Sequence, residues 1–341
     1  MKIGLAFLLG WAPIALYAGE GFFLTVGGID TEGPDGHRIE AEFGTICRSV
    51  DGEKWREAFK GGPVKDGFNH AKNNMLRCMT YGHGRFVATG NPKAIVTSTD
   101  GLTWTVVEAP GGGMSVEFGN GIFLAPNAYS FMRSTDGLIW DKSPLKPDFK
   151  VWGREGAGHV RKTVFGNGVF VCVGEQRLGV TKDGLSWVHH EILSDDKRPG
   201  RNVLLFGNGR FVWLTEKQGV RTSTDGIEWL PVDFPEVTGK HGENGVFDGH
   251  YFWTSAATWK DPKKAVYRSN DGVNWELAAE SSGTPAIRTA GNGLLLANIG
   301  HAKSFKFSSD GGKSWKEANV GIGSRKVYFF DGKRMVGQSG G

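Results

Sequence analysis

One short phrase occurs seven times along this chain: Ser or Thr, any residue, Asp, Gly, and then Trp after two or three intervening residues. The first copy is Ser49-Val-Asp51-Gly52 followed by Trp55, and the last has one extra residue before Trp315. The aspartates of the seven copies are Asp51, Asp100, Asp136, Asp183, Asp225, Asp271 and Asp310. Self-similarity at such a spacing is the signature of a repeat architecture. The repeat therefore restricts the fold before any single residue is weighed.

Each copy predicts a tight turn between two strands. Asp followed by Gly between apolar runs is a strong hairpin signal, because the carboxylate accepts hydrogen bonds from nearby main-chain N–H groups. Gly supplies the positive φ that a side chain would resist. The Trp then enters the next strand, where its burial contributes roughly a few kcal/mol. These aspartates are consequently expected to have structural roles.

A second phrase alternates with the first and predicts a second kind of turn. It reads Phe118-Gly-Asn-Gly121 in one copy and Phe165-Gly-Asn-Gly168 in the next, each followed by apolar and aromatic residues. Together the two phrases give a unit of four antiparallel strands, with strands expected near 161–165, 169–173 and 178–181 and a fourth through Trp187. A four-stranded unit repeated every 36 to 49 residues indicates an all-β fold, a single β-propeller.

The count favours seven four-stranded blades. The first blade has only three strands at the N-terminus, through Phe23, Ile46 and Trp55, and residues 326–330 resemble its missing inner strand. Pairing of the N- and C-terminal strands would then close the ring and remove long sheet edges. Residues 333–338 form a surplus strand with no place in this scheme, and six or eight blades stay open as alternatives.

The first 18 residues have the pattern of an export signal. Lys2 precedes an apolar run, and Ala18 is a small residue suited to cleavage. We expect a signal peptide at 1–18, a propeller domain at 19–341, and a secreted or periplasmic protein with no membrane segment after cleavage. A retained anchor and a buried first strand are the alternatives.

Composition and net charge exclude few other classes of function or partner. A net charge of +4 is too small to indicate nucleic-acid binding by itself, and no nucleic-acid partner is expected. Cys47, Cys78 and Cys172 lack the spacing of a metal site and are expected as buried thiols, with a Cys47–Cys78 disulfide as an alternative. We expect no metal, no cofactor and a monomer.

The Ser-x-Asp-Gly-x-x-Trp phrase resembles the Asp box, or BNR repeat, of the sialidase-like β-propeller superfamily. The resemblance covers the mature chain and implies Asp boxes at the blade periphery, away from the active face. The superfamily includes sialidases, other glycoside hydrolases, polysaccharide lyases, sorting receptors and a photosystem assembly factor. It therefore implies a fold far more specifically than a function.

Sialidase activity is not expected from the resemblance. Sialidases carry a Phe/Tyr-Arg-Ile-Pro motif before the first Asp box, and the nearest string here is His37-Arg38-Ile39-Glu40. The tyrosine nucleophile of that family also has no assignable match. No catalytic residue is carried over from it.

Basic residues recur near the starts of the expected inner strands, which line the channel of a propeller. Guanidinium groups bind carboxylate and phosphate through two parallel hydrogen bonds, so a ring of them would attract an anion. The expected ligand-binding residues are His70, Arg77, Trp152, Arg154, Arg161, Arg201, Arg288 and Arg325. In the alternative, each arginine extends to solvent or pairs with an acid of the next blade.

The segment from Trp152 to Arg161 is the strongest candidate for chemistry. It combines a stacking ring and two guanidiniums with Glu155 and His159, which are the candidate catalytic groups because both residue types can be tuned toward neutral pH. A glycine-rich connector is the structural alternative. Residues 29–42 form an unusually long expected loop, and such loops are often functional.

Two functions follow from these patterns. The first is a secreted protein that binds or processes an acidic oligosaccharide or polysaccharide, as a hydrolase or a lyase. The second is a non-catalytic propeller that binds a protein partner. The first depends on analogy of fold, which is weak evidence for activity.

Overall fold

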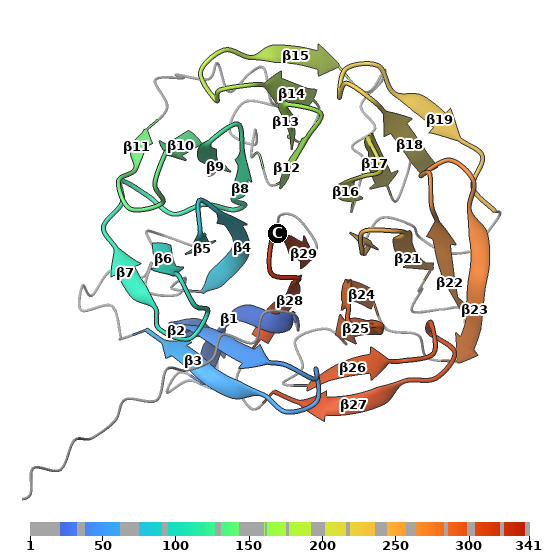
Figure 1. Cartoon of the computed structure of the whole chain (residues 1–341), viewed down its shortest axis with the longest axis horizontal. Coiled ribbons are helices and arrows are strands. Elements are labelled where there is room, and N and C mark those ends of the chain that lie inside the picture. Colours follow the sequence, from blue (N-terminus) through green and yellow to red (C-terminus); the bar gives the residue numbers. More distant parts are fainter. Residues whose placement is uncertain are drawn as a thin grey trace, which may run out of the picture.

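A computed structural model describes residues 21–32, 38–61, 75–90, 95–126, 131–142, 160, 162–174, 177–191, 202–215, 219–235, 244–256, 263–282, 286–298, 304–320 and 324–337. The described residues contain strands, turns and bends and no helix. Within them, no helix has the length and hydropathy needed to cross a membrane. Their strands form seven antiparallel sheets arranged in a ring, a seven-bladed β-propeller (Figure 1).

Six blades have four strands each, in chain order from the inside of the ring outward. Blade 2 contains β4 (Leu76–Gly82), β5 (Arg85–Gly90), β6 (Ile95–Ser98) and β7 (Thr105–Val107); blade 3 contains β8 (Glu117–Gly119), β9 (Ile122–Pro126), β10 (Phe131–Ser134) and β11 (Asp141–Lys142). Blade 4 contains β12 (Lys162–Gly166), β13 (Val169–Val173), β14 (Arg177–Thr181) and β15 (Val188–Glu191); blade 5 contains β16 (Asn202–Gly207), β17 (Arg210–Thr215), β18 (Gly219–Ser223) and β19 (Leu230–Val232). Blade 6 contains β20 (Val246–Phe247), β21 (Phe252–Ala256), β22 (Lys263–Ser269) and β23 (Glu276–Ser282); blade 7 contains β24 (Ala286–Gly291), β25 (Leu294–Asn298), β26 (Ser304–Ser308) and β27 (Lys316–Asn319).

Blade 1 closes the ring with strands from both ends of the described chain. Its order is β29 (Met335–Gly337), β28 (Ser324–Phe330), β1 (Phe22–Glu32), β2 (Arg38–Ser49) and β3 (Arg56–Lys60). β28 pairs with β1 from Phe22↔Phe330 to Gly27↔Ser324. The expected seven blades and their closure by terminal strands are confirmed.

The surplus C-terminal strand lies inside the ring. β29 pairs with the inner edge of β28, through Phe330↔Met335 and Phe329↔Val336, and also contacts β24 and β20. Figure 1 shows it within the circle of inner strands, beside the C-terminal marker. Since β1 already pairs with the outer edge of β28, the strand that follows β28 has only the channel side to occupy.

The hairpin at the start of the chain is longer than expected. Residues 29–42 were expected to form a loop, but β1 continues to Glu32 and β2 begins at Arg38, with Thr31 paired to Ile39. The expectation was wrong because Gly and charged residues suggested a loop, whereas the antiparallel ladder simply continues past the last pair with β28. The result is a two-stranded extension of blade 1.

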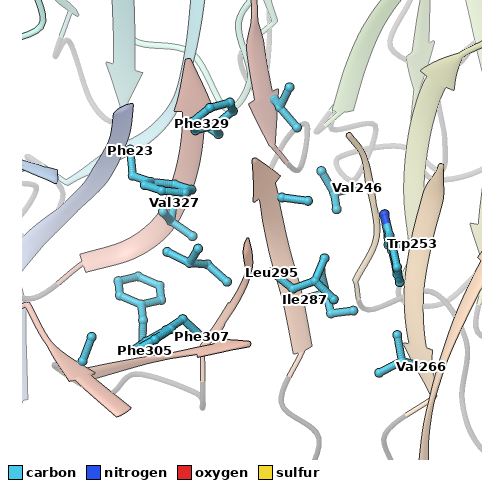
Figure 2. Packing of buried hydrophobic residues seen from close by; sticks show 14 of the residues in the cluster. Phe23, Val246, Trp253, Val266, Ile287, Leu295, Phe305, Phe307, Val327 and Phe329 are labelled. Atoms are coloured by element: carbon cyan, nitrogen blue, oxygen red, sulfur yellow. The ribbon is translucent and has the colours of Figure 1, made fainter. Parts of the chain in front are cut away.

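Apolar side chains fill the space between neighbouring blades. One cluster joins blades 1, 6 and 7 and includes Phe23, Phe329, Leu295 and Trp253 (Figure 2). Burial of each such aromatic ring contributes roughly a few kcal/mol, so this contact between blades supplies much of the stability of the ring.

Asparagine side chains connect the blades at the turns between inner and second strands. Asn167 adopts a positive φ of 46° and donates from Nδ2 to the carbonyl oxygens of Gly209 (2.8 Å) and Thr224 (2.7 Å) in the next blade. Asn120 does the same with Gly168 and Lys182. Asn tolerates this backbone conformation better than most residues, which explains the recurrent Gly-Asn-Gly phrase.

Candidate functional site

The Asp-box carboxylates bind the turns in which they lie. In blade 4, Asp183 accepts from the main-chain N–H groups of Leu185 (2.8 Å) and Ser186 (2.9 Å). Thr181 Oγ1 accepts from Gly184 N at 2.9 Å, and Trp187 Nε1 donates to the Gly184 carbonyl at 3.2 Å. The hydrogen bonds from Ser186 and Leu185 lower the pKa of Asp183.

The same arrangement holds the other Asp boxes. At Asp271, burial alone would raise the pKa, but hydrogen bonds from Asn274 and Val273 lower it to about 2. Serine or threonine hydroxyls hydrogen-bond to all seven carboxylates, which belong to Asp51, Asp100, Asp136, Asp183, Asp225, Asp271 and Asp310. Carboxylates so engaged are poor candidates for proton transfer near neutral pH.

The inner strands differ in polarity from blade to blade. Those of blades 5 and 6 carry Val203, Leu204, Leu205 and Val246, which are buried in the apolar clusters between blades. Those of blades 1 to 4 carry a set of polar and ionisable residues: Lys326, Tyr328, Arg77, Cys78, Thr80, Glu117 and Lys162. This polar stretch of the inner strands departs from the apolar pattern of the repeat, so it is the candidate functional site and is called the channel wall below.

Three cations on the inner strands of three consecutive blades interact electrostatically. Burial lowers the pKa of Lys326 on β28 to about 8; Cys78 acts in the opposite direction, and the charges of Arg288 on β24 and Arg77 on β4 lower it. Arg77, Arg288 and Lys326 are all partly exposed. The Cys78 thiol beside them is uncharged in this range, because burial raises its pKa to about 12.

Glu117 is the acidic member of the wall. Burial raises its pKa to about 8, although hydrogen bonds from Phe118 N (3.4 Å to Oε1) and from the Thr80 side chain act in the opposite direction. A carboxyl group with this pKa is largely protonated at neutral pH and can donate a proton or a hydrogen bond.

β29 lies next to this site along β28. Gly337 pairs with Tyr328, two residues from Lys326, a separation of about 7 Å along a strand. Val336 is buried, and its carbonyl oxygen accepts a hydrogen bond from Thr289 Oγ1 at 2.6 Å. The described C-terminal strand therefore occupies part of the channel beneath the cations.

Of the residues expected from sequence to bind ligand, the structure brings Arg77 and Arg288 together around Lys326. Arg325 lies in β28 next to Lys326, and its side chain is outside the described part. The remaining expected residues lie outside the described ranges: His70, Trp152, Arg154, Glu155, His159, Arg161 and Arg201. Sequence analysis missed Glu117, although an acid two residues before the turn glycine, where other blades have Thr80, Val164 or Leu205, was a usable signal.

The cysteines and acids form no further site in the described part of the chain. Cys47, Cys78 and Cys172 are free and buried, so Cys47 and Cys78 are not joined by a disulfide. Among the described residues, no group of three His, Cys, Asp or Glu side chains is arranged to hold a metal ion.

Similar solved structures support the fold. A catalytically inactive virginiamycin B lyase from Staphylococcus aureus, solved with quinupristin, superposes with a TM-score of 0.54 at 15% identity, covering 77% of this chain and 94% of the lyase. Apo AztD from Citrobacter koseri gives a TM-score of 0.54 at 11% identity over 94% of this chain and 99% of that one. The designed protein Ika8 gives 0.53 at 10% identity over 92% and 96%.

No family model and no curated protein matches the sequence. At these identities the structural neighbours support the β-propeller fold alone, and the seven blades come from the sheets of this structure.

Proposed function

We propose that this propeller binds an anionic ligand, of the acidic oligosaccharide or polysaccharide class, at the channel wall where Arg77, Arg288 and Lys326 meet. The observation that carries the proposal is the gathering of these three cations from blades 2, 7 and 1. The lowered pKa of Lys326 reflects burial first and then the repulsion of the two guanidinium groups, which also destabilises its charged form. A bound carboxylate would relieve it.

The channel wall suits a sugar acid better than a bare ion. Glu117, held by Thr80, offers a protonated carboxyl group near neutral pH, so it can donate to a ligand hydroxyl or carboxyl oxygen. The resemblance to Asp-box propellers, many of which act on glycans, points to the same ligand class. The same ligands also serve as substrates in a test of whether the protein cleaves them, by hydrolysis or by elimination.

The experiment is calorimetric titration with oligogalacturonate and sialyllactose, with a neutral oligosaccharide of equal length as control. The wild type should bind one acidic ligand, and the Arg77→Ala/Arg288→Ala double variant should bind it at least about tenfold more weakly, the loss expected for a desolvated charge-assisted contact. Arg56→Ala, on the outer strand β3, is the matched control and should leave affinity unchanged. Equal binding of neutral and acidic ligands, or an unaffected double variant that still folds, contradicts the proposal.

Binding should also weaken as Lys326 loses its proton. Because the pKa of Lys326 is about 8, affinity for a carboxylate should fall between pH 7 and pH 9. The slope should be shallower in Lys326→Gln, where only Glu117, whose pKa is also about 8, still ionises in this range. Product release, followed by reducing ends for hydrolysis and by ultraviolet absorbance for elimination, separates an enzyme from a binding protein.

A non-catalytic propeller that binds a protein partner is the second candidate. One observation favours it: β29 occupies part of the channel, which leaves less room for a ligand there. Failure of every acidic glycan to bind, with the polar wall intact, would favour this function.

We also propose that residues 1–18 direct export and that the propeller domain begins at residue 19. The pattern of Lys2, the apolar run and Ala18 supports this. Mass spectrometry of the protein from its natural cells should find a chain that starts after Ala18, in the secreted or periplasmic fraction. An intact Met1 in the cytoplasm would overturn it.

A further inference from the structure

A surface cavity lies at the rim of the ring, away from the channel. It has a volume of about 770 Å³ and joins two neighbouring blades. Asp233, Phe234 and Pro235, which follow β19 of blade 5, form one side, and Val273, Asn274 and Trp275 of the blade 6 Asp box form the other. β19 and β23 stand on the outer edge of the ring in Figure 1. This cavity is called the rim pocket below.

Aromatic rings form the apolar wall of the rim pocket. The Phe234 ring lies 5.1 Å from Trp275 and 5.2 Å from Tyr267, measured between centroids. Trp275 is further fixed by its Nε1, which donates to the Gly272 carbonyl at 3.2 Å. Phe234 is partly exposed, whereas Trp275 is 9% exposed. The pocket is therefore built on a rigid aromatic base.

The charge in the rim pocket is negative. Among its six lining residues, Asp233 is the charged one, and it is exposed at the edge. Asn274 donates from Nδ2 to Asp271 Oδ2 at 2.7 Å, which fixes its amide and leaves its carbonyl oxygen as an acceptor. Asp271 itself stays ionised, since its pKa is about 2.

Two arginines near the blade 6 turn are engaged elsewhere. Arg268 pairs with Glu276 at 2.6 Å, with its guanidinium over the Tyr251 ring. Arg210 packs its aliphatic stem toward Gly272 and donates to Thr222 Oγ1 at 3.3 Å. Asp233 is therefore the charged lining residue of the rim pocket, and Asp271 adds a second carboxylate in contact with the lining residue Asn274.

We propose that the rim pocket is a second binding site, specific for an organic cation such as an alkylammonium or guanidinium group on an apolar body. An aromatic wall attracts a cation through the ring quadrupole, and a carboxylate at the edge adds Coulomb attraction. The acceptor oxygen of Asn274 gives an N–H donor of the ligand a partner. A neutral sugar would use the rings and the amide but gain nothing from the negative charge.

The chain contains a matched comparison at another blade junction. Glu108, Ala109 and Pro110 follow β7 as Asp233, Phe234 and Pro235 follow β19, and Ala109 packs in the cluster that contains Trp140 of the next Asp box. There, alanine stands in place of the Phe234 ring. Ile139, which is 72% exposed, stands in place of Asn274. The acid, the proline and the Asp-box tryptophan are thus shared by both junctions, whereas the Phe234 ring and the Asn274 amide are absent from the comparison junction.

The test compares a cation with its neutral isostere by titration of the full chain at low salt, followed by NMR or calorimetry. Choline and N-acetylarginine methylamide are the cationic probes, and 3,3-dimethylbutanol and glucose are the neutral ones. The wild type should bind one cation about tenfold more tightly than 3,3-dimethylbutanol, the ratio expected for combined ring and carboxylate contacts. Preference for choline indicates a free quaternary ammonium ligand, and preference for the arginine derivative indicates a side chain of a partner protein.

Variants separate the two contributions. Asp233→Asn should reduce the preference for the cation over the isostere, because only the ring contribution then remains, while Phe234→Ala should weaken both about tenfold. Glu108→Gln, the same kind of charge change at the comparison junction, should alter neither. The proposal is overturned by equal binding of choline and its isostere, by tighter binding of glucose, by no binding of any cation, or by a preference that is unchanged in Asp233→Asn.

Discussion

Thr289 donates a hydrogen bond from Oγ1 to the main-chain carbonyl oxygen of Val336 at 2.6 Å, and both residues are buried. The bond joins β24 of blade 7 to β29, whose strand pairing otherwise involves only β28 among the described strands. It therefore fixes the edge of β29 that is not paired with β28. Removal of the hydroxyl should loosen β29 without affecting the seven blades themselves.

Thr289→Val tests this relationship. The substitution keeps the shape of the side chain but leaves the Val336 carbonyl buried without this donor, at a cost of about 1–3 kcal/mol in the free energy of unfolding. Hydrogen exchange should become faster at β29 before it does in any blade. Thr97→Val, which removes a similar bond to the Phe86 carbonyl within blade 2, is the control and should leave β29 protected. Unchanged exchange at β29 in Thr289→Val would contradict the assignment.

The asparagine contacts between blades predict a graded loss of stability. Asn167→Gly keeps the positive φ easily but deletes two hydrogen bonds to blade 5, so it should lower the free energy of unfolding by about 1–3 kcal/mol in urea titrations. Asn167→Ala should cost about 1 kcal/mol more, since alanine resists a φ of 46°. Asn292→Gly, which removes a longer bond of 3.3 Å to the Gly21 carbonyl, should cost less than Asn167→Gly. An equal loss at both positions would show that the contacts carry little energy.

Blade number could be predicted because its cause is local, and ring closure by β28 then followed from counting the strands at the two ends of the chain. Each Asp-Gly turn and each Trp is set by neighbours within a few residues, so the pattern repeats visibly in the sequence. The position of β29 has a non-local cause. Met335 and Val336 follow a turn just as Phe211 and Val212 follow theirs, yet β1 already occupies the corresponding edge of β28. Competition between two distant segments for one strand edge gives no recognisable pattern in the sequence of either segment.

The candidate site was predictable only in part, for a similar reason. Arg77 and Arg288 were identified by residue type and position, but only the ring places both of them around Lys326. Glu117 was missed because its neighbours in sequence are ordinary strand residues. Its raised pKa arises from burial, which outweighs the opposite effect of the hydrogen bond from Thr80 in another blade.

Close packing of inner-strand glycines against aromatic rings gives another prediction. A Cβ added to Gly166 would lie 2.1 Å from the Phe206 ring of the next blade, whereas one added to Gly168 would meet nothing within 4 Å. Gly166→Ala should therefore lower stability by about 3 kcal/mol or more through a clash between blades. Gly168→Ala should cost about 1 kcal/mol, from its φ of +77° alone. Thermal unfolding of the two variants checks the order, and a larger loss at Gly168 would contradict it.

Glu117 makes the stability of the propeller depend on pH in a defined window. Its pKa is about 8 in the folded protein and about 4.3 in the unfolded chain, so the folded state binds more protons between these values. The stabilising contribution is complete below about pH 4 and is lost as pH rises toward 8. Glu117→Gln cannot ionise and should escape this loss, so its stability relative to wild type should rise by about 4 kcal/mol between pH 5 and pH 8.5. Lys326 has the opposite effect, because its lowered pKa makes stability rise with pH above about 8. Its contribution is common to both proteins and cancels in the difference between them.

Urea titrations at pH 5, 6.5 and 8.5 measure the difference in stability between wild type and Glu117→Gln. Glu57→Gln on the outer strand β3 is the control that should show no trend. A difference between wild type and Glu117→Gln that stays constant with pH would mean that Glu117 is ionised in the folded protein and interacts as an anion with the cations of the channel wall.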